Sequence, residues 1–80
     1  MRITRVCASR SARGHILGKH GVELWEVEEA LLGDRDALRV GEGRYACVGC
    51  TSEGRRLRVV FEVRTHAREV TAHVITAIPL

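Results

Sequence analysis

The sequence predicts an α+β fold in which an N-terminal helical segment packs on one face of an antiparallel sheet of three to five strands. Apolar residues in the first half recur at the helical spacing of three and four, whereas after Gly33 their spacing changes to two. The chain has 80 residues, of which 45% are hydrophobic. That is enough for one small core, so we expect a single domain over residues 1–80.

The first 22 residues predict an extended stretch and a short helix. Residues 2–7 include the β-favouring Ile3 and Thr4 and are expected to form an edge strand. Ser9 or Ser11 is expected to cap a helix that runs to about Lys19. Gly21 then supplies the left-handed residue that commonly ends a helix.

Residues 23–32 carry the clearest helical pattern. The expected apolar arc consists of Leu24, Trp25, Val27, Leu31 and Leu32. Glu26 and Glu29 are expected on the opposite, solvent-facing side, and Trp25 is expected as an anchor in the core.

Four later stretches alternate as strands do, namely residues 37–40, 44–51, 56–64 and 69–77. Turns are expected at 41–43, 52–55 and 65–68, where glycine and polar residues gather. Pro79 has no backbone N–H and is expected to end the pairing.

The alternation also predicts two faces for this sheet. Leu57, Val59, Phe61 and Val63 are expected under the helices, and Arg56, Arg58, Glu62 and Arg64, with Val60 among them, on the open face. A hairpin turning at Glu53-Gly54 would place Ala46, Val48 and Cys50 under the helices. It would place Tyr45, Cys47, Gly49 and Thr51 on the open face. If Arg64 closes against Glu69, His73 lies beside Val60, and the open face collects Tyr45, Arg58, Glu62 and His73. A slip of one residue would exchange the two faces.

The charge is distributed as basic, acidic and basic segments. Residues 1–20 carry five basic residues and no acid, residues 21–42 carry seven acids and two arginines, and residues 43–80 carry six arginines and three glutamates. A basic patch from the first and last segments would attract a polyanion such as RNA. The alternative is an ordinary solvated surface whose charges cancel locally. The aromatic residues are too few for a module that binds bases by stacking on aromatic rings.

The three cysteines do not form a disulfide framework, because their number is odd. Reduced thiols and the absence of an apolar run of about 20 residues predict a cytoplasmic protein with no membrane partner. Cys47 and Cys50 have the C-x-x-C spacing of metal sites, but in a strand they would face opposite sides and no second pair exists. We expect structural thiols, no bound metal and no cofactor. A small metal-binding domain around Cys47 and Cys50 remains a third hypothesis.

Cleavage of RNA without a metal requires a base near the 2′-hydroxyl, an acid near the leaving 5′-oxygen and cations around the phosphate. The expected open-face cluster of Arg58, Glu62 and His73 contains these groups. The alternative is that long polar side chains on the solvent face of a half-buried sheet have no chemical role.

Several short motifs, in order, resemble the BrnT family of toxins. Residues 15–31 (HILGKHGVELWEVEEAL) are similar to the family's opening Lys/Arg-His-Gly-Val step and Glu-rich helix. Residues 43–45 (GRY), 49–51 (GCT) and 54–62 (GRRLRVVFE) follow the family's strands and hairpin in sequence. Residues 74–77 (VITA) resemble its closing strand. The resemblance covers residues 15–77, and together with their spacing these motifs predict a single BrnT-like domain.

The resemblance implies a RelE-like fold and a metal-independent endoribonuclease of a type II toxin–antitoxin pair, which inhibits translation by cleaving RNA. Its partners would be RNA and an antitoxin from a neighbouring gene, in a homo-oligomer or a hetero-oligomer with the antitoxin. The expected catalytic residues are His20, Arg58, Glu62 and His73. The expected RNA-binding residues are Lys19, Arg44, Tyr45, Arg56 and Arg64.

Two positions depart from the family's pattern. Cys50 and Ile78 stand where the family commonly has a basic residue. Loss of two phosphate contacts would weaken catalysis, since one such contact contributes about 2–4 kcal/mol to lowering a barrier. The alternative function is therefore a catalytically impaired interaction module that binds an antitoxin or RNA.

Overall fold

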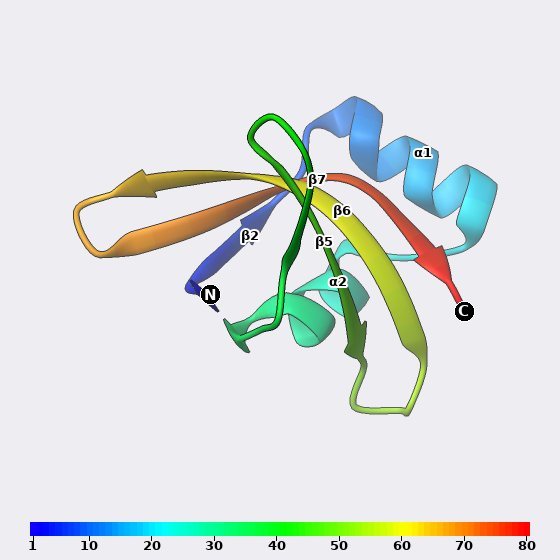
Figure 1. The fold of residues 1–80 in the computed structure, drawn as a ribbon. Helices are drawn as coiled ribbons and strands as arrows, with labels where there is room; N and C mark the ends of the chain where they lie inside the picture. The colour runs from blue at the N-terminus through cyan, green and yellow to red at the C-terminus, as the bar shows by residue number, and fades with distance from the viewer.

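The structure is a computed structural model that describes residues 1–80, and it contains two helices and two sheets (Figure 1). The helices are α1 (Arg10–His20) and α2 (Leu24–Leu31). The five strands of the main sheet are β2 (Arg5–Cys7), β4 (Leu38–Gly41), β5 (Arg44–Cys50), β6 (Arg56–His66) and β7 (Glu69–Pro79). Their order is β2-β7-β6-β5-β4. A small second sheet pairs β1 (Arg2–Ile3) with β3 (Gly33–Asp34).

The main sheet is mixed rather than wholly antiparallel. β2 runs parallel to β7, whereas the three other neighbouring pairs are antiparallel. The single edge strand expected over residues 2–7 is also wrong, because Thr4 separates β1 from β2. The Thr4 hydroxyl accepts a hydrogen bond from Val70 N at 2.8 Å at the point where pairing passes from β3 to β7. A parallel neighbour requires a long crossover, which here is the chain from α1 to β6.

Both ends of α1 are formed by the residues that the sequence indicated. Ser9 is the N-cap, and its side chain accepts a hydrogen bond from Ala12 N at 3.0 Å. Gly21 has a φ of 64° and ends the helix, with Val22 N donating to Ile16 O at 3.0 Å. This is the glycine-terminated helix end that satisfies the last carbonyls.

The buried side of α2 differs from the expected one. Val27, Ala30 and Leu31 are buried, but Trp25 is 47% exposed and Glu26 is buried. The expectations of Trp25 in the core and Glu26 in solvent are therefore wrong. The helix is rotated toward the side on which Arg55 pairs with Glu26, and the Trp25 indole N–H donates to the Glu23 carboxylate outside the core.

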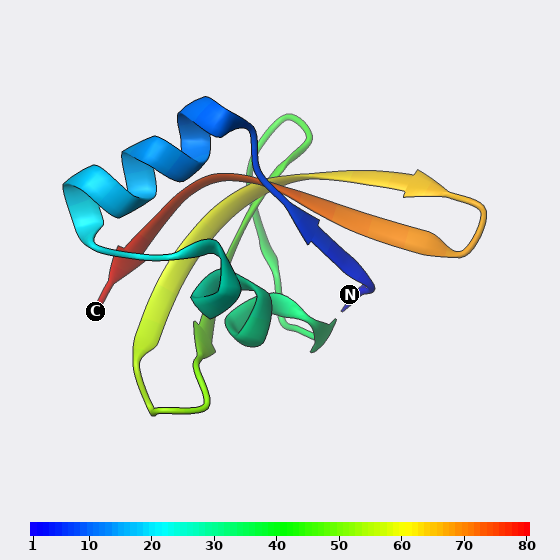
Figure 2. The same cartoon turned by 180° about the vertical axis from the view of Figure 1, so that it is seen from behind.

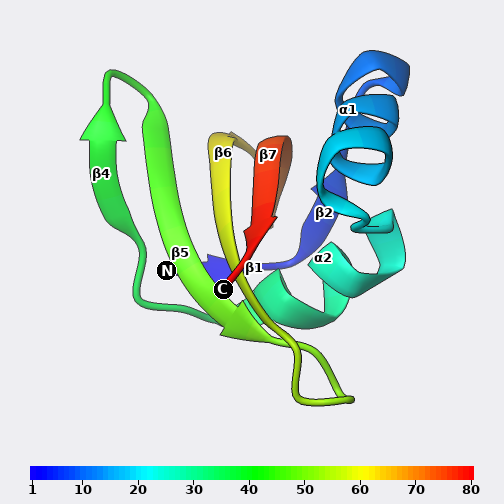
Figure 3. The same ribbon diagram turned by 90° about the vertical axis from the view of Figure 1, so that its right-hand side faces the viewer.

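Both helices lie on the same side of the sheet, and the other side is open (Figure 3). Figure 2 shows the helices from behind, with α1 along β7 and α2 across the middle of the molecule. The core joins Ile16, Val27 and Leu31 of the helices to residues of the inner face of the sheet: Leu57, Val59, Phe61, Ala72 and Val74. No helix is long and apolar enough to cross a membrane.

The hairpin of β5 and β6 is shifted by one residue from the expected register. Arg44 pairs with Glu62 and Tyr45 pairs with Phe61. The loop has three residues instead of four, since Thr51 N donates to Arg55 O at 2.8 Å and Gly54 takes a φ of 84°. Three-residue loops commonly place glycine in this left-handed conformation. The shift puts Ala46, Val48 and Cys50 on the open face, and turns Tyr45, Cys47 and Gly49 toward the helices.

The hairpin of β6 and β7 also closes later than expected. His66 pairs with Glu69 around a turn of Ala67 and Arg68, so Glu62, rather than Val60, lies opposite His73. The register shifts between Val60 and Phe61, which is the mark of a β-bulge in β7. Pairing continues through Pro79, beyond its expected end, and Leu80 N donates to Arg56 O at 3.0 Å.

Gly49 allows α2 to lie directly against β5. A Cβ atom at this position would stand 2.1 Å from the carbonyl oxygen of Ala30, which is far inside van der Waals contact. The close approach of the helix backbone therefore requires glycine at this point of the strand.

Candidate nucleic-acid interface

A row of four polar side chains crosses the open face of the sheet. Arg44, Glu62, His73 and Cys7 are successive partners on β5, β6, β7 and β2. Direct cross-strand partners point to the same face, so the four side chains are neighbours. Arg44 Nε lies 3.6 Å from Glu62 Oε1, and Cys7 Sγ lies 3.1 Å from His73 Nδ1. We call these residues the open-face row.

The open-face row is accessible from solvent. The side chains of Arg44 and Glu62 are 56% and 41% exposed, and His73 and Cys7 are half-buried. An exposed ion pair such as Arg44–Glu62 contributes only about 0–1 kcal/mol to folding. The row can therefore exchange its internal contacts for contacts with a ligand at little cost in stability.

The open face carries an excess of positive charge. Along the paired strands it has five arginines, namely Arg5, Arg44, Arg56, Arg58 and Arg64, and two carboxylates, Glu62 and Glu69. Arg5 pairs with Glu69 at 3.4 Å and Arg44 with Glu62, whereas the other three arginines form no ion pair in the chain. Unpaired arginines on one face are suited to binding phosphate groups.

The two positions that lack the expected basic residue lie beside arginines of β6. Cys50 pairs with Arg56, and Ile78 pairs with Arg58. Since paired residues share a face, β6 supplies a guanidinium next to each position. This half of the face is otherwise apolar, with Val48 48% and Ile78 37% exposed.

Most of the residues predicted for the site share the open face, but three do not. Arg44, Arg56, Arg58, Glu62, Arg64 and His73 lie there together. Tyr45 is turned inward by the register shift and stacks on Phe61 with 6.2 Å between ring centroids, so its predicted place on the open face is wrong. Lys19 and His20 end α1, which packs on the inner face.

His20 lies outside the open-face row, in a cluster formed by Arg55, Glu26 and the end of α1. We call this cluster the structural corner. Arg55 donates to Gly21 O at 3.1 Å and His20 O at 3.4 Å, and its Nη1 donates to both carboxylate oxygens of Glu26 at 3.0 Å. The guanidinium thus caps the carbonyls at the end of α1. His20 ends α1 on the helix side of the sheet and His73 faces the open side opposite Glu62, so the two imidazoles do not converge.

The contacts of Glu26 change the pKa of its carboxyl. Burial alone would raise the pKa of this carboxyl, but the hydrogen bond from the Glu23 backbone N–H and the Arg55 guanidinium outweigh it. The net result is a pKa below the ordinary value of 4.5. The carboxylate of Glu26 is therefore part of what holds α1, α2 and the β5–β6 loop together.

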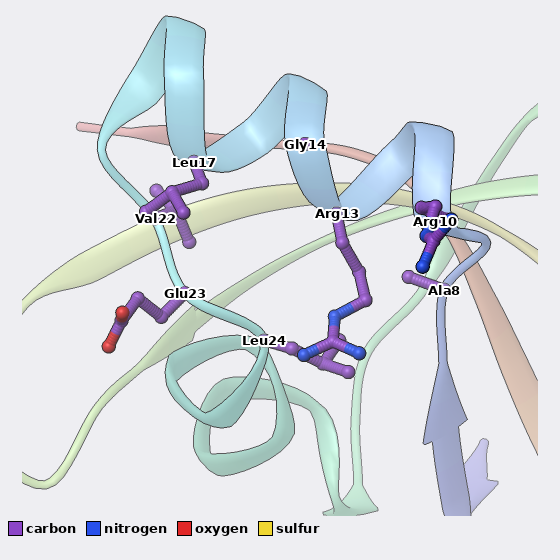
Figure 4. A pocket seen from close by; sticks show the side chains of 8 residues that line it. All are labelled: Ala8, Arg10, Arg13, Gly14, Leu17, Val22, Glu23 and Leu24. Carbon is purple, nitrogen blue, oxygen red and sulfur yellow. The ribbon is translucent and has the colours of Figure 1, made fainter.

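A pocket of about 430 Å³ lies between the helices on the other side of the molecule (Figure 4). Its lining consists of Ala8, Arg10, Arg13, Gly14, Leu17, Val22, Glu23 and Leu24. The Arg13 side chain points from α1 toward Leu24 at the start of α2. No imidazole or thiol lines the pocket and Glu23 is its one carboxylate, so it lacks the combination of imidazole and carboxylate found in the open-face row.

Cys47 and Cys50 cannot bind one metal ion together. Cys47 is buried in the core, where desolvation raises the pKa of its thiol, and Cys50 is exposed on the open face. No three His, Cys, Asp or Glu side chains converge as metal ligands anywhere in the structure. The hypothesis of a metal-binding domain around this pair is therefore wrong.

Sequence reasoning did not find Cys7 as a member of the site. The residue lies 66 positions before His73, and β2 reaches β7 by a parallel pairing that leaves no local signal. A half-buried thiol beside an imidazole is visible only in the folded chain.

The fold is similar to that of a solved ribonuclease toxin, BrnT from Brucella abortus, known from a crystal structure at 1.1 Å resolution. The two structures superimpose with a TM-score of 0.72 over 96% of each chain, at 16% sequence identity. No protein-family model matches the sequence, and no curated protein matches it. The chain therefore has a BrnT-like fold.

Proposed function

We propose that this BrnT-like chain is a metal-independent endoribonuclease toxin of a type II toxin–antitoxin pair, acting in the cytoplasm. Its substrate is RNA, whose cleavage inhibits translation, and its partner is an antitoxin encoded by a neighbouring gene. The open-face row is the single observation that carries this proposal. It holds an imidazole, a carboxylate and a guanidinium on an exposed face with three further unpaired arginines.

The chemistry we assign to the row is transfer of the phosphodiester to its own 2′-oxygen. Glu62 accepts the 2′-hydroxyl proton as the oxygen attacks phosphorus, and His73 donates a proton to the 5′-oxygen as its bond to phosphorus breaks. Arg44, the direct partner of Glu62, stabilises the charge that develops on the phosphate, and Arg58, four residues before Glu62 on the same face, adds positive potential along β6. General acid–base catalysis of this kind contributes a factor of about 10²–10⁴.

The remaining arginines of the open face bind the RNA strand. Arg56 and Arg64 lie on either side of the row along β6 and contact phosphates that flank the scissile bond. Lys19 and His20 lie at the end of α1, behind the sheet, so in this proposal they take no part in breaking the bond. Lys19 contributes positive charge at that end of the helix.

The test combines bacterial growth with cleavage of a purified RNA. We expect expression of the wild-type chain to stop growth, and the purified chain to cleave RNA in the presence of EDTA. His73→Gln should lower the cleavage rate by about 10²–10⁴. His20→Ala, the matched control on the other side of the sheet, should stay within about threefold of the wild type, since this change removes no acid or base of the open-face row. Equal rates for His73→Gln and the wild type would refute the proposal.

A second candidate function is an interaction module of the same fold that binds an antitoxin or RNA without turnover. The observation that favours it is the occupation of two expected basic positions by Cys50 and Ile78. Co-expression with the neighbouring gene separates the two candidates. Toxicity relieved by the neighbour supports the enzyme, whereas a stable complex from a non-toxic chain supports the module.

A further inference from the structure

Cys7 is the one thiol of the protein that contacts an imidazole. Its Sγ lies 3.1 Å from Nδ1 of His73 and 4.0 Å from Nε2 of the same ring. The two residues are direct partners in the parallel pairing of β2 with β7, so the backbone of the sheet fixes the contact. The arrangement is therefore part of the fold rather than a chance approach of two flexible side chains.

The other two thiols provide an internal comparison. Cys50 is exposed and Cys47 is buried, whereas Cys7 is half-buried. Cys50 pairs with Arg56 and has no imidazole contact, and the Cys47 thiol faces the carbonyl oxygen of Val48 at 3.7 Å. If access alone decided reactivity, Cys50 would react first. A thiol that can pass its proton to an imidazole reacts as the thiolate, which is the nucleophilic form.

We propose that Cys7 and His73 form a reactive thiol–imidazole pair, and that peroxides and alkylating agents modify Cys7 before Cys47 and Cys50. His73 takes the proton of Cys7. The sulfur then attacks one oxygen of hydrogen peroxide, an S–O bond forms and the O–O bond breaks. The leaving hydroxide takes the proton from the imidazolium and departs as water. The product is the sulfenic acid of Cys7, with sulfur oxidised and peroxide reduced.

The position of the pair connects this chemistry to the open-face row. Nδ1 faces the sulfur, which leaves Nε2 as the nitrogen available to RNA. A sulfenic acid on Cys7 adds an oxygen beside the ring and competes for its proton. Resting on the proposed function, we expect peroxide to inhibit RNA cleavage and dithiothreitol to restore it. Dithiothreitol does so by forming a mixed disulfide with loss of water, which its second thiol then reduces.

The decisive measurement is alkylation of the folded full-length protein by iodoacetamide, followed for each cysteine by peptide mass spectrometry. We expect Cys7 to react about tenfold faster than Cys50, because the imidazole of His73 can accept the thiol proton as the sulfur attacks, with Cys47 the slowest. In His73→Gln, the rate at Cys7 should fall below that at Cys50. A rate at Cys7 equal to or below that at Cys50 in the wild type would overturn the proposal. This comparison requires no variant and does not depend on RNA cleavage.

The expected inhibition of RNA cleavage by peroxide is tested by a separate measurement. Peroxide should lower cleavage by the wild type and by Cys50→Ser alike, and Cys7→Ser should lose this sensitivity. A peroxide effect that persists in Cys7→Ser would overturn the link between the thiol and the site. A chain that cleaves no RNA under any condition would overturn the proposed function, and the order of alkylation would still decide whether the reactive pair exists.

Discussion

Two pairs of glutamate and arginine in this protein have the same chemistry and opposite settings. Arg55 and Glu26 meet at 3.0 Å with side chains that are 36% and 11% exposed. Arg44 and Glu62 meet at 3.6 Å with side chains that are 56% and 41% exposed. The first pair also caps the end of α1 through the carbonyls of His20 and Gly21, whereas the side chains of the second form an ion pair without a hydrogen bond.

Exposure decides which of these charged side chains are free to bind a ligand. Arg55 replaces the water that the Glu26 carboxylate would otherwise bind, so removing Arg55 leaves this carboxylate buried and unpaired. The Arg44–Glu62 pair stays hydrated in the folded protein. A phosphate can therefore displace one partner at little cost in folding free energy. The structural corner and the open-face row are thus separated by exposure and not by residue type.

The largest expected effect is that of Glu62→Gln on the exposed pair. We expect it to lower RNA cleavage by about 10²–10⁴ because the base is lost. The free energy of unfolding should change by less than about 0.5 kcal/mol, since the residue is exposed. Cleavage assays and urea denaturation measure the two effects. Glu69→Gln is the matched control, with the same charge change on the same face, and should retain cleavage within a few-fold. A large loss of stability in Glu62→Gln would place it with the structural corner.

The contact of α2 with β5 should be very sensitive to an added side-chain atom. Gly49→Ala places a Cβ atom 2.1 Å from Ala30 O, so the helix must move away. We expect a loss of about 3 kcal/mol in the free energy of unfolding, as for other overpacked sites. Gly14→Ala is the control, since nothing lies within 4 Å of its added Cβ, and it should stabilise α1 by about 0.5–1 kcal/mol. Equal stability of the two variants, measured by urea denaturation, would contradict the close approach.

The Arg55–Glu26 pair should make the free energy of unfolding depend on pH. Glu26→Gln should lower the free energy of unfolding by about 2 kcal/mol at pH 7, because a hydrogen-bonded charge pair is lost. The pKa of Glu26 is lowered on folding from 4.5, so its contribution is present above that pH and disappears as the pH falls through the folded value. Denaturation curves should therefore show the wild type approaching the variant below pH 4.5. A difference that stays constant down to acid pH would contradict this assignment.

The smallest effect should come from a single arginine of the open face. Arg64→Ala should weaken binding of single-stranded RNA a few-fold and reduce the slope of log K against log salt by about 0.7. Fluorescence anisotropy at several salt concentrations measures both quantities. Arg13→Ala is the control on the helix side of the molecule. An equal change of slope in Arg13→Ala would indicate that RNA also binds at the pocket between the helices.

Local signals in the sequence predicted the parts of this fold that depend on neighbouring residues. Ser9 and Gly21 end α1 as their capping chemistry requires, and the alternation of β6 separates Phe61 from Glu62. These features follow from the backbone conformation of a few adjacent residues. They were sufficient to place Arg56, Arg58, Glu62 and Arg64 on one face.

The side chains that meet across the sheet depend on contacts between residues far apart in the sequence. A loop of three residues instead of four moved Tyr45 into the core, and a tighter turn at Ala67 brought His73 opposite Glu62. The pairing of β2 with β7 then added Cys7, and Arg55 withdrew Glu26 from solvent. Strand register and long-range pairing are set by the sum of contacts over the whole core, because a shift of one residue costs nothing locally and exchanges every side chain between the two faces. The alternation of residues along β6 thus determined which of its side chains share the open face. The strand pairings of the folded chain determined which residues form the open-face row.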